Sequence, residues 1–217
     1  PKTAGTAVVR HLERNTLPQE RRPIYEGTAL DRDFETILRN KSVKAIYGHF
    51  YWQSTFRDQG LYAFTFLRKP QQREVSNYLF ICSSSDPGHR RWRQEWRNFG
   101  DYLRSKQAFN RQTRMLSGMG AFLYFQEHQE EALQKAQESL KFFNRIGFQE
   151  NFHASLKAIS EDLGWDPPAR EIHNSGKQRL RARWLLFRYQ KELDRVTRLD
   201  QALYAYASRL EDERLPE

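Results

Sequence analysis

The order of apolar and polar residues indicates strands and helices that alternate in the first part of the chain. Residues 43–47 form a short β-like run that ends at a glycine, and residues 62–67 form a more continuous apolar run of the kind buried on both faces of a sheet. A helix is predicted after the glycine-containing turn at residues 1–6, and another over residues 74–83. Strands that alternate with helices predict a parallel α/β sheet.

From about residue 88 the pattern becomes helical. Apolar residues recur at helical spacing over residues 132–143 and 152–163, and residues 184–196 and 199–210 are predicted to be closing helices. Residues 173–177 have the composition of a turn-rich loop. We therefore expect one α/β domain over residues 1–217, in which a parallel sheet is flanked by helices and the C-terminal half is mostly helical.

Residues 89–106 mix arginine with aromatic residues, and two interpretations remain open. The segment is predicted to be an amphipathic helix whose Trp92, Trp96 and Phe99 pack inward at helical spacing. Alternatively, it lines a groove for a sugar or a polyanion, since aromatic rings stack on sugars and arginine pairs with acidic groups.

Charge and cysteine content limit the binding partners and the cellular compartment, but they do not identify the function. The net charge of +9 should attract polyanions, which include nucleic acids, acidic glycans and nucleotides with several phosphates. Cys82 is the single cysteine, so an intrachain disulfide is excluded and a reducing, cytoplasmic setting is expected. The alternative location is the Golgi lumen, if an N-terminal anchor was removed. We expect no transmembrane segment, because no apolar stretch approaches the roughly 18 residues of a membrane span.

The first six residues, PKTAGT, have the composition of an anion-binding turn. A turn that leads into a helix directs backbone N–H groups, and the positive end of the helix dipole, to one point. Gly5 allows close approach of an anion, Lys2 supplies a full charge, and Thr3 and Thr6 supply hydroxyl donors. The spacing of a Walker A loop is absent. The alternative is an ordinary helix cap made by one of the two threonines.

A second candidate site follows the apolar run at residues 62–67. Arg68 comes directly after this predicted strand, and ligands of open α/β sheets bind beyond the carboxyl ends of the strands. Ser76 lies eight residues further on, on the predicted helix, and a guanidinium with a hydroxyl can clamp a phosphate. The alternative is that both residues are solvated surface groups.

These two segments resemble the nucleotide-binding motifs of sulfotransferases that use 3′-phosphoadenosine-5′-phosphosulfate (PAPS). PKTAGT resembles their 5′-phosphosulfate loop, commonly PKTGGT or PKTAST, and FLRKPQQREVSNYLF (66–80) resembles their 3′-phosphate segment, commonly FLRDPxxRxxSxY. The match is to the carbohydrate-type branch, which includes heparan sulfate 2-O-sulfotransferases and bacterial sulfotransferase family 2 proteins. Further stretches resemble that branch in the same order: YGHF (47–50), NRQTRMLSG (110–118), FNRIGFQENFHASLKAISEDLGW (143–165, a helical segment in the family) and LDQALYAYASRL (199–210).

The resemblance implies a P-loop-like fold whose first strand lies before residue 1, and it implies an O-sulfation activity. The co-substrate would be PAPS, which leaves as 3′-phosphoadenosine-5′-phosphate (PAP), and no metal would be needed. Lys2 would stabilise the charge that grows on the bridging oxygen as PAP leaves. The residues implied to bind the co-substrate are Lys2, Thr3, Ala4, Gly5, Thr6, Ala7, Arg68 and Ser76, with Ser175 and Lys177 added by a looser likeness. Lys69 departs from the pattern, which usually has Asp there.

His49 is the candidate base that takes the proton of the acceptor hydroxyl, because an imidazole of near-neutral pKa suits that role and the residue follows a predicted strand. The alternative is a histidine packed in the core. The branch resembled favours a saccharide hydroxyl as acceptor and no specific nucleic acid as partner. Two other functions stay open: a basic nucleic-acid-binding module, and a catalytically degenerate protein that binds PAP.

Overall fold

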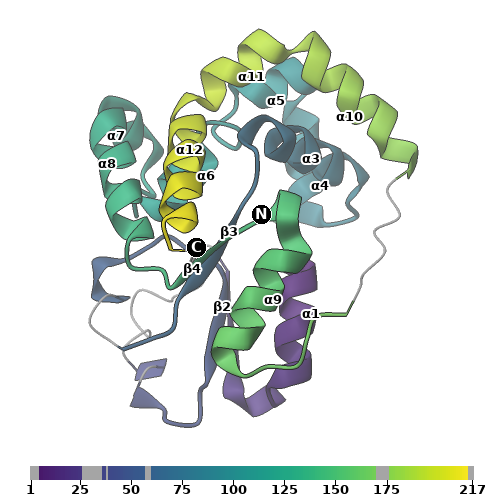
Figure 1. Ribbon diagram of the computed structural model, residues 1–217. Helices are drawn as coiled ribbons and strands as arrows, with labels where there is room; N and C mark the ends of the chain where they lie inside the picture. The colour runs from purple at the N-terminus through teal and green to yellow at the C-terminus, as the bar shows by residue number, and fades with distance from the viewer. Residues whose placement is uncertain (1–4, 26–35, 38, 57–59, 170–175, 215–217) are drawn as a thin grey trace.

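The computed structural model describes residues 5–25, 36–37, 39–56, 60–169 and 176–214 (Figure 1). Within these residues, four strands form two parallel pairs, β1 with β2 and β3 with β4. The strands are β1 (Arg21–Tyr25), β2 (Ala45–His49), β3 (Phe64–Leu67) and β4 (Arg145–Phe148). The described part of the chain is thus α/β with parallel strands and is mostly helical, as the sequence predicts.

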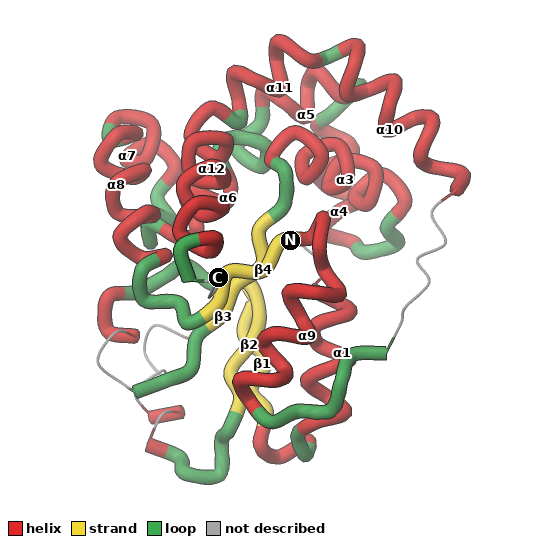
Figure 2. Tube along the Cα trace, in the orientation of Figure 1, coloured by secondary structure: helices red, strands yellow, loops and turns green. Residues whose placement is uncertain are grey.

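Helices surround the strands on several sides (Figure 2). They are α1 (Gly5–Asn15), α3 (Pro70–Ser83), α4 (Pro87–Glu95), α5 (Phe99–Arg104), α6 (Arg111–Leu116), α7 (Phe122–Glu127), α8 (Gln129–Leu140), α9 (Phe152–Leu163), α10 (Gly176–Arg188), α11 (Gln190–Val196) and α12 (Arg198–Asp212). Short 3₁₀ turns lie at Pro18–Glu20, Ser54–Phe56 and Gln149–Asn151. Across the residues that the structure describes, no helix combines the length and apolar character needed to cross a membrane.

Strand β3 is covered on both faces, which confirms the prediction from its continuous apolar run. Phe66 packs with Leu156 and Ile159 of α9 on one side. The next residue, Leu67, packs with the cluster of α8 and α12 that includes Leu140 and Leu203. Because successive side chains of a strand point to opposite faces, one short strand joins two apolar clusters.

The expectation that the chain is helical throughout from about residue 88 is wrong at β4. Arg145–Phe148 is a strand that pairs in parallel with β3. A side chain at Gly147 would lie 2.5 Å from the Phe66 ring, so the glycine makes room for that ring between the paired strands. The pairing partner lies far away along the chain, so local periodicity does not reveal it.

Several helix boundaries also differ from the predicted ones. Helix α3 begins at Pro70 rather than residue 74, because proline is well tolerated in the first turn. The segment 89–106 is two helices, α4 and α5, and Asn98 caps the second by accepting a hydrogen bond from the Asp101 N–H. Trp96 and Phe99 are buried and Trp92 packs against the same core cluster, so the predicted inward packing is confirmed.

The predicted C-terminal helices are confirmed, but the first of them is divided into two. The predicted helix 184–196 is α10 followed by α11, which are separated at Tyr189. Residues 176 and 177 were expected in a loop, but they begin α10. The predicted helix starts at residue 184 and α10 starts at Gly176, so the prediction places the start eight residues too late.

Candidate active site

The end of β2 brings His49 against the start of α1. A side chain carbon added at Gly5 would lie 3.8 Å from the His49 Cε1 atom, which is van der Waals contact. Gly5, Thr6 and Ala7 make up the first turn of α1, and the structure places Gly5 next to the predicted base. Lys2, Thr3, Ala4 and Ser175 lie outside the described residues, and of Lys177 only the backbone is described, in α10.

Gly48 fixes the path of the backbone into His49. Its φ is +151°, and a Cβ at this position would lie 1.6 Å from the carbonyl oxygen of Ile24 on β1. Only glycine lets the two strands pair here without a severe clash. The glycine of the YGHF segment is therefore structural, and it determines where the following imidazole lies.

The surroundings of His49 favour its neutral form. The pKa of His49 is lowered to about 3, mainly by partial burial and then by the positive charges of the N-terminus, Arg111 and Arg73. A neutral imidazole has a free lone pair on one ring nitrogen and can accept a proton. At neutral pH the residue is thus in the protonation state that a general base requires.

A titration of His49 by NMR is expected to show this low pKa. The imidazole signals should stay those of the neutral ring from pH 8 to about pH 4, whereas an exposed histidine titrates near 6.5. Because the folded pKa lies below the unfolded one, the unfolded chain binds a proton between these values, so the stability is full above pH 6.5 and falls as the pH drops towards 3. A His49 pKa near 6.5 would contradict the buried, arginine-flanked placement.

Arg68 is held through its backbone by one glutamine. The Arg68 N–H donates to Gln112 Oε1 at 3.0 Å, and Gln112 Nε2 donates to the Arg68 carbonyl at 3.0 Å. This pair of bonds fixes the turn that joins β3 to α3 while leaving the guanidinium out of the clamp. Burial lowers the pKa of Arg68, the charge of Glu150 raises it, and that of Arg73 lowers it; arginine stays protonated nonetheless.

Gln112 in turn is fixed by a buried polar cluster, which sequence analysis did not find. Asp200 of α12 accepts hydrogen bonds from the Gln112 N–H at 3.1 Å, and from the N–H and hydroxyl of Thr113 at 2.7 Å each. Asn110 adopts a left-handed backbone with φ 42°, and its Oδ1 accepts from the N–H groups of Leu199 and Asp200. The NRQTRMLSG stretch is thus a scaffold that positions Arg68.

Glu150 supports the same turn from the other side. Its Oε1 accepts from the Lys69 N–H at 2.9 Å, and its Oε2 accepts from the Tyr204 hydroxyl at 3.0 Å. The turn therefore has a carboxylate beside Arg68, although Lys69 stands where the sulfotransferase pattern has Asp. This contact gives a physical reason why the departure at Lys69 leaves the turn intact.

Arg73 is a further site residue that sequence analysis missed. It lies on α3 with only 1% of its surface exposed, forms an ion pair with Glu74, and its Nη2 has no hydrogen-bond partner among the described residues. Its charge lowers the pKa of both His49 and Arg68, so it lies close enough to act on both side chains. Ser76, which is half-buried, follows three residues later on the same helical face. The second arginine of FLRDPxxRxxSxY was the signal that could have revealed it.

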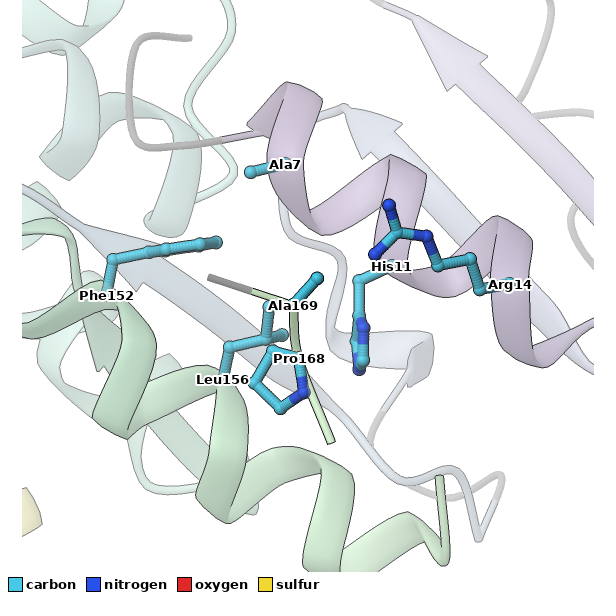
Figure 3. A pocket seen from close by; sticks show the side chains of 7 residues that line it. All are labelled: Ala7, His11, Arg14, Phe152, Leu156, Pro168 and Ala169. Atoms are coloured by element: carbon cyan, nitrogen blue, oxygen red, sulfur yellow. The ribbon is translucent and has the colours of Figure 1, made fainter. Parts of the chain in front are cut away.

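A small pocket lies beside this site, between α1 and α9 (Figure 3). Its lining includes Ala7 but neither His49 nor Arg68. The His11 imidazole lies 2.8 Å from the Ser160 hydroxyl at this junction, and burial lowers the His11 pKa. We assign the pocket to packing between the two helices.

The described residues thus bring His49, the first turn of α1, Arg68 and Arg73 into one region at the ends of β2 and β3. A base, a helix N-terminus and two cations are together suited to a reaction of a polyanionic substrate. Comparison of the chain with protein-family models, with curated proteins and with solved structures finds no match in any of the three.

Proposed function

We propose that this protein is a sulfotransferase of P-loop-like fold, which moves the sulfuryl group of PAPS to an acceptor hydroxyl. The observation that carries the proposal is the position of the His49 imidazole, whose Cε1 atom would lie 3.8 Å from a Cβ added at Gly5 in the first turn of α1. An 11-residue helix attracts anions at its N-terminus, and here a neutral base stands beside that end. The motif order along the chain supports the same function.

The proposed reaction is an in-line displacement at sulfur. The acceptor oxygen forms a bond to sulfur as the bond from sulfur to the bridging phosphate oxygen breaks, and the hydroxyl proton goes to His49. The first-turn amides of α1, with Gly5 and Thr6, hold the 5′-phosphate. By the resemblance, Lys2 neutralises the charge on the leaving oxygen.

Arg68 and Ser76 are proposed to hold the 3′-phosphate, which distinguishes PAPS from ordinary adenylates. Gln112 fixes the turn at Arg68 through main-chain atoms, so the guanidinium starts from a defined position. A positioned guanidinium loses less side-chain entropy when it binds a phosphate. Arg73 adds positive charge to the same region from within α3.

Binding of the donor should also change the pKa of His49. The phosphates of PAPS bring negative charge close to the start of α1, which favours protonated imidazole and raises the pKa of His49 from its low value in the free protein. A base with a higher pKa takes a proton more readily. We further propose a saccharide as acceptor, because that is the acceptor class of the branch resembled, and a cytoplasmic setting.

The donor site is tested by calorimetry with PAP, AMP and ATP at about 150 mM salt, where weak non-specific attraction is screened. PAP should bind at least about tenfold more tightly than AMP, because a charge-assisted phosphate contact contributes about 1.5–3 kcal/mol. The Arg68→Ala variant should lose this difference and still fold, because the Gln112 clamp bonds only to the backbone.

The matched control is Arg91→Ala, which removes an exposed arginine of α4. It should leave the PAP-to-AMP ratio unchanged. If PAP and AMP bind equally to the unchanged protein, or if neither binds, the PAPS site is wrong.

A further inference from the structure

Helix α10 carries an exposed apolar stripe that the proposed site does not use. Leu180, Trp184 and Phe187 are 77%, 58% and 83% exposed. Their spacing of four and three residues places them on one helical face. Such a row of large apolar side chains in water is unusual and marks a surface that contacts a partner.

The other face of α10 is already packed. Leu185 is buried in the core cluster of α3 and α5, and Ala182 and Leu186 pack against that cluster. In Figures 1 and 2 the helix runs along the outer edge of the helical part, above α3. The helix is thus anchored by one side, and the stripe faces outward on a fixed support.

The charged residues of α10 itself all have one sign. Arg179, Arg181, Arg183 and Arg188 are exposed on the same helix. The sequence of Gly176–Arg188 contains no acidic residue. A partner for this surface must therefore combine an apolar phase with negative charge.

We propose that α10 binds the surface of an anionic lipid membrane and lies in the plane of its interface. Leucine, tryptophan and phenylalanine insert at the boundary of the acyl chains, and flanking arginines pair with lipid phosphates. A membrane without net charge would accommodate the apolar stripe, but it would not attract the arginines. The three stripe residues and the four arginines are not among the residues proposed to bind the donor, so the proposal holds whether or not the protein transfers sulfate.

Two other occupants fit the surface less well. A second copy of the chain in a two-fold dimer would bring the same arginines together, and like charges repel. A nucleic acid supplies phosphates and stacking bases for Trp184, but it offers no apolar phase for Leu180. Only an anionic membrane matches both the stripe and the charge.

Sedimentation with vesicles tests the proposal. The full chain at about 150 mM salt is mixed with vesicles of phosphatidylcholine alone, or with about one third phosphatidylserine. Binding should be strong only to the anionic vesicles. The triple variant Leu180→Ser, Trp184→Ser, Phe187→Ser should lower the partition coefficient at least about tenfold, because insertion requires the apolar side chains.

The control is Leu123→Ser on α7, which removes an equally exposed leucine (75%) from a surface outside the stripe. This variant should sediment like the unchanged protein. The proposal is overturned if the unchanged protein stays in solution with anionic vesicles. It is also overturned if the triple variant binds as well as the unchanged protein, since charge alone would then explain the binding. A dimer in solution that the triple variant dissociates, without vesicle binding, would assign the stripe to a second copy.

Discussion

Replacing His49 with glutamine is expected to lower the rate of sulfuryl transfer from PAPS by about 10²–10⁴, the usual contribution of a positioned general base. Glutamine has a similar length but cannot accept a proton at neutral pH. PAP affinity should change little, because the phosphate contacts that we propose come from the first turn of α1 and from Arg68. The measurement is single-turnover transfer from labelled PAPS to a saccharide acceptor, together with PAP calorimetry.

The control is His153→Gln, which changes an exposed histidine of α9. It should transfer sulfate at the rate of the unchanged protein. If His49→Gln keeps the full rate, His49 is a packing residue and another group takes the proton. If it loses rate and PAP affinity equally, the side chain acts in donor binding instead.

The positions of the two candidate site residues were predictable because each follows a strand that the sequence indicates. β3 is an unbroken apolar run, so Arg68 after it was expected at the carboxyl end of a strand. The run predicted at residues 43–47 is a weaker signal, and the structure places the strand at Ala45–His49, so His49 is its last residue. Local sequence was sufficient to predict these two positions because each site residue is adjacent in the chain to its predicted strand.

The scaffold behind Arg68 was not predictable, because its contacts join distant segments. The Gln112 clamp spans 44 residues of sequence, and the bond from the Gln112 N–H to Asp200 spans 88. Neither segment has a local sequence pattern that indicates which distant segment it contacts. The same reason explains β1 and β4, whose pairing to β2 and β3 is long-range.

The motif resemblance and the structure explain different properties of the same residues. The resemblance marked NRQTRMLSG as one stretch of a family pattern, and the hydrogen bonds show what Asn110, Gln112 and Thr113 do. They connect α12 to the turn at Arg68. The turn that holds Arg68, the proposed phosphate ligand, thus depends on a carboxylate of the last helix, so the scaffold can be tested by a substitution at that carboxylate.

Replacing Asp200 with alanine is expected to lower the free energy of unfolding by about 3–5 kcal/mol, the range for removing one partner from a buried charged network. Asp200 is fully buried, and its carboxylate accepts three hydrogen bonds from Gln112 and Thr113. The variant leaves these donors unsatisfied and removes a negative charge that acts on buried Arg73. The measurement is equilibrium unfolding in urea.

The matched control is Asp212→Ala, at the exposed end of the same helix. It should change the free energy of unfolding by less than about 0.5 kcal/mol, as surface substitutions usually do. Under conditions where Asp200→Ala remains folded, PAP should also bind more weakly, because Gln112 no longer has a fixed backbone from which to hold Arg68. Equal stability losses in the two variants would show that the Asp200 cluster does not support the turn, and an unchanged PAP affinity would separate the cluster from the donor site.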